Sequence, residues 1–228
     1  MAIGNSKSIE ERRVLPAGAT ELSERAFNLI IGGVLLWGFL LNYLMVAFYT
    51  PQVYRLISQI GYRGFLLGYF VLCIAGSFMI ATPKPVLSFI GYNLIAVPVG
   101  MVVCVCLGSY TIATIKSAVL VTAVVTLSLM ILGTLFTDFF LSMGRALGVS
   151  LLVAIVAELI STFIFHTHPV IYEWIFVAIF SLYIGFDWAR ANTCARTVDN
   201  AVDLAASLYL DIINLLLRIL SIMGKRND

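Results

Sequence analysis

Residues Asn200 to Met223 read NAVDLAASLYLDIINLLLRILSIM, a segment that is apolar enough to span a bilayer and yet carries charged side chains. On a helix its polar residues recur at steps of four, four, three and four, so they share one face: Asp203, Ser207, Asp211, Asn214 and Arg218. A charged side chain near the bilayer centre costs at least about 2.5–3.5 kcal/mol. Because this polar face cannot contact lipid, it must face a helix bundle or a watery cavity. The sequence therefore predicts that the last helix is a central one.

The composition of the whole chain indicates an integral membrane protein. Of its 228 residues, 61% are hydrophobic and only 11% are charged, whereas a soluble domain carries about 25% charged residues. The net charge is only +2 and no basic patch interleaves with aromatic residues, which argues against a nucleic-acid partner. Residues 1–25 are polar and lack the layout of a signal peptide, so we expect the first apolar helix to be retained.

Seven apolar runs predict an all-α membrane protein with seven transmembrane helices in residues 26–228, preceded by a polar tail at residues 1–25. Each run has 18 or more residues, which suits a bilayer core of about 30 Å. Pro51 is predicted to close the first span, and a small excess of Lys and Arg favours an N-terminus inside the cell. The predicted spans are residues 26–48, 64–81, 86–107, 118–136, 146–165, 170–187 and 200–223.

Asp187 and Asp211 are the strongest candidates for a functional site, because ionisable residues inside a membrane are usually functional. The link between the last two helices turns around Asp199. Asp187 lies 12 residues before this point and Asp211 lies 12 residues after it. In an antiparallel hairpin the two carboxylates then lie at similar depth. Adjacent carboxylates cannot easily both ionise, so a shared proton would join the helices, whereas two charges would repel and admit a cation. The alternative is that Asn, Ser or Arg satisfies each carboxylate separately.

Other polar residues inside the apolar runs have structural interpretations. Glu158 lies deep in the fifth span without a partner nearby in sequence; it is either a hydrogen-bonded structural residue or a third carboxylate of an ion pathway. Asp203 falls in the first turn of the last helix, where a negative charge is favourable. Asn42 and Asn93 are predicted to form hydrogen bonds between helices.

Residues at the ends of the spans offer little chemistry. Asp138 and Glu173 fall at membrane boundaries and are predicted to be solvated. His166 and His168 have no third ligand nearby in sequence, so they are interpreted as ordinary loop residues rather than a metal site. No hydrolase, metalloprotease or phosphate-binding motif occurs, and we therefore predict no enzyme activity and no bound cofactor.

Two segments resemble the C-terminal signature of the Bax inhibitor family, the transmembrane Bax inhibitor motif proteins of bacteria and eukaryotes. They are SLYIGFDWARAN (Ser181–Asn192) and LYLDIINLLLRIL (Leu208–Leu220). The resemblance implies a last helix surrounded by the other six, and a pH-sensitive calcium leak gated by Asp187 and Asp211, which would bind calcium transiently. A family basic residue that contacts the first aspartate has Lys84 as its nearest counterpart here. The chain departs from the family pattern at Phe186 and Trp188, where Tyr and Thr are usual.

The first functional hypothesis is thus a leak channel of the bacterial inner membrane, with lipid, protons and permeant calcium as its partners. The alternative is a non-conducting membrane regulator that modulates a membrane protease or cell-survival partner through residues 1–25. A third hypothesis is a proton-coupled transporter that also uses Glu158.

Overall fold

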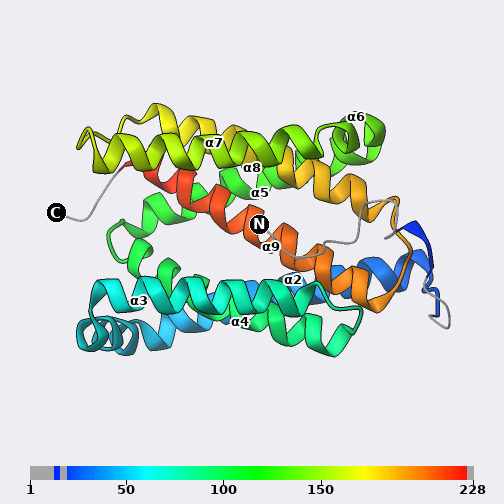
Figure 1. The fold of residues 1–228 in the computed structure, drawn as a ribbon, viewed down its shortest axis with the longest axis horizontal. Helices are drawn as coiled ribbons and strands as arrows, with labels where there is room; N and C mark the ends of the chain where they lie inside the picture. The colour runs from blue at the N-terminus through cyan, green and yellow to red at the C-terminus, as the bar shows by residue number, and fades with distance from the viewer. Residues whose placement is uncertain (1–12, 16–19, 225–228) are drawn as a thin grey trace. The chain divides into compact units, whose positions relative to one another are not determined.

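The computed structural model describes residues 13–15 and 20–224, and the elements in these ranges are all helices (Figure 1). The all-α prediction is confirmed. The elements are α2 (Glu24–Leu44), the π-helical turn η1 (Met45–Tyr49), α3 (Thr50–Ile80), α4 (Pro85–Leu107), α5 (Ile112–Leu135), α6 (Thr137–Ser142), α7 (Gly144–Phe163), α8 (Ile171–Ala191) and α9 (Val198–Met223). The tail boundary predicted at residue 25 falls just inside α2, and the rest of the predicted tail lies largely outside the described residues.

Local side-chain signals explain where several helices begin and end. Hydroxyl oxygens of Ser23, Thr111 and Thr197 each accept a hydrogen bond of 3.2 Å from the backbone N–H three residues later. This satisfies one of the unpaired amides at the start of α2, α5 and α9. At the other end of α9, Gly224 has a φ of 63°, the left-handed conformation in which glycine commonly terminates a helix.

Six helical stretches of the described residues are long and apolar enough to cross a membrane. The first of them, Glu24–Ile80, contains α2, η1 and α3, which the sequence predicts as two spans, so the seventh span stays a prediction. Pro51 does not close a helix as expected. It lies in the first turn of α3, where its missing N–H costs nothing. Helical geometry is interrupted at Tyr49, the last residue of η1, with a φ of −116° and a ψ of 1°, and again at Gly61, with a φ of 74°.

The chain divides into two compact units. The first holds α2, η1, α3, α4 and the first half of α9; within it α3 and α2 both pack on α4. The second holds α5 to α8 and the second half of α9; within it α8 packs against α5, α6 and α7. The last helix therefore contributes to both units, and its predicted central position stays a prediction.

Tyr209 of α9 organises the core of the first unit. Its ring packs edge-on against Tyr92 with centroids 5.4 Å apart, and its hydroxyl accepts a hydrogen bond of 2.9 Å from the amide of Asn42 on α2. Gly38 makes room for these rings, since a Cβ there would overlap the Tyr92 hydroxyl. The predicted role of Asn42 is confirmed. That of Asn93 is confirmed as well, because its side-chain oxygen accepts a 2.9 Å bond from a tryptophan of α2.

In the second unit, α5 and α8 approach closely at Gly133 and Gly185. A Cβ at Gly133 would lie 2.6 Å from the carbonyl oxygen of Gly185, a distance at which the backbone must move. We expect Gly133→Ala to destabilise the protein by about 1–3 kcal/mol through overpacking. The measurement is the thermal unfolding midpoint in detergent. Gly32→Ala is the matched control, because a Cβ there meets nothing within 4 Å; equal midpoints for the two variants would refute this contact.

Candidate functional site

Asp187 of α8 and Asp211 of α9 lie together in the second unit. Both are buried, with 3% and 8% of their surface exposed. The Asp211 carboxyl group is within hydrogen-bonding reach of the Asp187 carboxyl group, yet its Oδ2 has no partner of good hydrogen-bond geometry among the described residues. Ionised carboxylates only accept hydrogen bonds, whereas a protonated carboxyl also donates one. A single proton held between the two groups would therefore supply the missing donor.

Arg190 is the cation beside this pair, and the sequence reasoning missed it. Its Nη1 donates a hydrogen bond of 2.6 Å to Asp187 Oδ1. The guanidinium lies 5.5 Å from the ring centroid of Phe186, which helps to hold it in place. The signal was present in the sequence, since residues three apart on a helix are neighbours and Arg190 follows Asp187 at that spacing.

The other polar residues singled out in the sequence, among them Lys84 and those on the polar face of α9, each have surroundings of their own. Lys84 is exposed at the N-cap of α4 in the first unit, and its contact with the first aspartate stays a prediction. The prediction that Asp203 falls in the first turn of the last helix is wrong, because α9 begins earlier, at Val198, and Asp199 is the acidic residue of its first turn. Asp203 is buried and Ser207 is half-buried in the first half of α9. The Asn214 side-chain amide donates a 2.7 Å hydrogen bond to the backbone carbonyl of Leu210, one turn earlier in its own helix. This N–H is therefore not donated to either aspartate.

Arg218 of α9 forms a second cluster of charges in the same unit. Its Nη1 and Nη2 donate to the two carboxylate oxygens of Glu158 at 2.7 and 3.0 Å, and Nη1 also donates to Glu173 Oε2 at 3.1 Å. The guanidinium stacks over the ring of Phe176, 4.0 Å from its centroid. A bidentate arginine–carboxylate pair is among the strongest polar contacts in proteins. The cluster thus ties α9 to α7 and α8.

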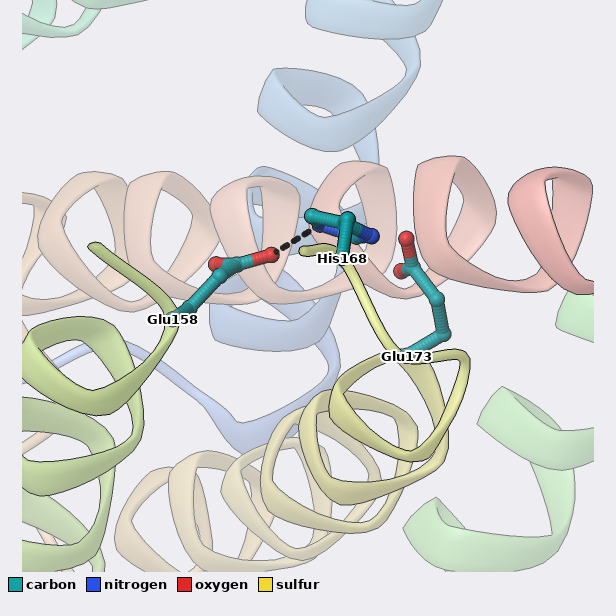
Figure 2. A group of neighbouring side chains, drawn as sticks. All are labelled: Glu158, His168 and Glu173. Carbon is teal, nitrogen blue, oxygen red and sulfur yellow. Dashed lines mark hydrogen bonds and ion pairs between the residues drawn. The ribbon is translucent and has the colours of Figure 1, made fainter. Parts of the chain in front are cut away.

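Two further side chains complete this cluster. The Ser221 hydroxyl donates a 2.8 Å bond to Glu173 Oε1, and His168, in the link between α7 and α8, lies 2.9 Å from Glu158 Oε1 through its Nε2 (Figure 2). The prediction that Glu173 is solvated is wrong: it is 5% exposed, because Arg218 and Ser221 of α9 satisfy its carboxylate. Glu158 is hydrogen-bonded by Arg218 and His168, which agrees with the interpretation of Glu158 as a hydrogen-bonded structural residue.

Comparison with known proteins gives the chain a family context. Residues 20–228 match the protein-family model described as Inhibitor of apoptosis-promoting Bax1. Two uncharacterized proteins from two strains of Helicobacter pylori are each 35% identical over 88 residues. That stretch covers 38% of this chain and 37% of either relative, so the similarity spans little more than a third of their length.

Proposed function

Because the chain belongs to the Bax inhibitor family of multi-pass membrane proteins, we propose that it is a pH-sensitive calcium leak gated by Asp187 and Asp211. The observation that carries this proposal is the burial of the two carboxyl groups against each other on neighbouring helices α8 and α9. The similar proteins of Helicobacter pylori favour the bacterial cell membrane, the inner one, as its location.

The mechanism follows from the charge on the pair. With one shared proton, the Asp187 and Asp211 carboxyl groups hydrogen-bond and hold α8 against α9, which is the closed state. With both groups ionised, they repel each other at contact distance in a medium of low dielectric. The repulsion favours separation of the helices, and two carboxylates facing a gap then offer the hard oxygen ligands that calcium prefers.

The direction of the pH effect is fixed by this scheme. Lowering the pH supplies the shared proton and closes the leak, whereas raising the pH removes it and opens the leak. We expect purified protein in liposomes to conduct calcium faster at about pH 8 than at about pH 6, with protein-free liposomes as the control. Equal flux at both values would exclude gating by the pair. Flux no faster than in protein-free liposomes would favour the non-conducting regulator instead.

Arg190 should set the pH at which the leak opens. Its positive charge offsets the repulsion between two ionised carboxylates, so Arg190→Gln makes the shared proton of the proposed closed state harder to remove. We expect the midpoint of the flux–pH profile to move upward by about one unit. Arg145→Gln is the matched control, since Arg145 is exposed at the start of α7 in the same unit. A midpoint that moves downward, or moves equally in both variants, would contradict this role.

A further inference from the structure

The cluster around Arg218 carries more negative than positive charge. Glu158 and Glu173 contribute two carboxylates, and Arg218 contributes one guanidinium that pairs with both of them. Glu173 is buried and Glu158 is only 18% exposed at its side chain. An uncompensated charge costs far more in such surroundings than in water. The cluster therefore has the electrostatic capacity for one further cation.

The ligand atoms needed to hold that cation converge at one edge of the cluster. His168 Nε2 and Glu158 Oε1 are 2.9 Å apart, and these two atoms and a carboxylate oxygen of Glu173 all lie within 4.8 Å of one another. Neighbouring ligand atoms on a tetrahedral zinc ion with bonds of about 2.1 Å are separated by about 3.4 Å. Figure 2 shows the three side chains reaching this place from α7, from the α7–α8 link and from α8.

The kind of ion follows from the mixture of ligand atoms. Calcium and magnesium prefer sites made only of oxygen, whereas an imidazole nitrogen combined with carboxylates suits zinc and similar divalent ions. We propose that Glu158, His168 and Glu173 bind a divalent transition-metal ion such as Zn²⁺, with Arg218 as the resident positive charge that the ion partly displaces. The His168 side chain is 45% exposed, which gives the ion a route from water.

Binding requires a local exchange of partners and the movement of one proton. In the 2.9 Å hydrogen bond His168 Nε2 carries the proton, because the Glu158 carboxylate only accepts; exchange with water moves this proton to Nδ1 and frees the Nε2 lone pair. The ion then takes Nε2 and Glu158 Oε1 in place of that bond and of the Nη1 contact of Arg218. Arg218 retains its 3.0 Å bond from Nη2 to Glu158 Oε2. The bound ion then links α7, the α7–α8 link and α8. Neither aspartate of the proposed gate is a ligand, so a test of this metal site does not depend on whether the protein conducts calcium.

The test uses the full chain in detergent and Zn²⁺ or Co²⁺ alone as the probe. We expect wild type to bind one ion, to unfold at a higher temperature with zinc, and to give the visible absorption of protein-bound cobalt. His168→Asn should weaken binding at least about tenfold. His166→Asn is the matched control and should bind as wild type does. His166 lies in the same link with a φ of 51°, a conformation that asparagine tolerates.

Two further variants separate this site from other metal ligands. Arg218→Gln should bind zinc more tightly, because the competing charge is gone, and Asp211→Asn should bind as wild type does. The chain also has four cysteines, and binding to them is recognised by the intense sulfur-to-cobalt absorption that nitrogen and oxygen ligands lack. The proposal is overturned if His168→Asn and His166→Asn bind equally, if the cobalt spectrum shows thiolate ligands, or if wild type binds nothing at about 1 mM zinc.

Discussion

Replacing Arg218 with methionine is expected to destabilise the protein by about 2–4 kcal/mol, the largest loss among single changes to its polar contacts. Removing one partner of a buried ion pair leaves the other charge uncompensated, which costs about 3–5 kcal/mol. The figure is lower here because the Arg218 side chain is 25% exposed. Methionine keeps the apolar contact with the ring of Phe176, so the loss reports the charge rather than the packing. The measurement is thermal unfolding in detergent, with a chelator present so that no metal ion replaces the guanidinium.

Two comparisons identify the cause of this loss. Arg196→Met removes a pair with Glu21 whose side chains are 42% and 51% exposed, and such pairs contribute only about 0–1 kcal/mol. Adding Glu158→Gln and Glu173→Gln to Arg218→Met should recover most of the stability, because no unpaired charge then remains. If the triple variant is no more stable than Arg218→Met alone, the loss does not come from unpaired carboxylates.

The sequence predicts the helices well because their signal is local. Apolar runs of membrane length depend only on residues that are neighbours in the chain. The exception was Pro51, where the same residue is compatible with the end of one helix and with the first turn of the next. The short helix α6 was not predicted, since a run of six residues is below the length at which periodicity is informative.

The two charge clusters differ in how far they could be predicted. The sequence led to Asp187 and Asp211 because both helices leave the same short link, so equal counts along the chain imply equal depth. No such rule relates Glu158 to Arg218, which are 60 residues apart on helices that are not consecutive. The sequence predicts that Glu173 is solvated because it lies at a membrane boundary. Its burial depends instead on hydrogen bonds from Arg218 and Ser221 of α9. Pairing of this kind becomes visible only when the helices are assembled.

If the protein is the proposed calcium leak, Asp211→Asn is expected to have the largest effect on flux, because it should lock the leak closed. The asparagine amide donates a hydrogen bond to Asp187 at every pH, as the shared proton does in the closed state. It also removes one of the two charges whose repulsion opens the pair. We expect calcium flux at about pH 8 to fall at least tenfold and the pH dependence to disappear. The protein should be at least as stable as wild type, which distinguishes a closed leak from an unfolded one.

Asp187→Asn provides the asymmetric counterpart of this variant. It also removes the repulsion, but it takes away the carboxylate that accepts the 2.6 Å bond of Arg190, so this variant should be less stable than Asp211→Asn by about 1–3 kcal/mol. Asp138→Asn, at an exposed position of the same unit, controls for the loss of a carboxylate and should conduct as wild type does. The difference in stability between Asp187→Asn and Asp211→Asn tests the contact between Arg190 and Asp187. The calcium flux through the two variants tests whether the aspartate pair is the gate. Undiminished, pH-dependent flux through Asp211→Asn would show that the buried carboxyl pair only stabilises the protein.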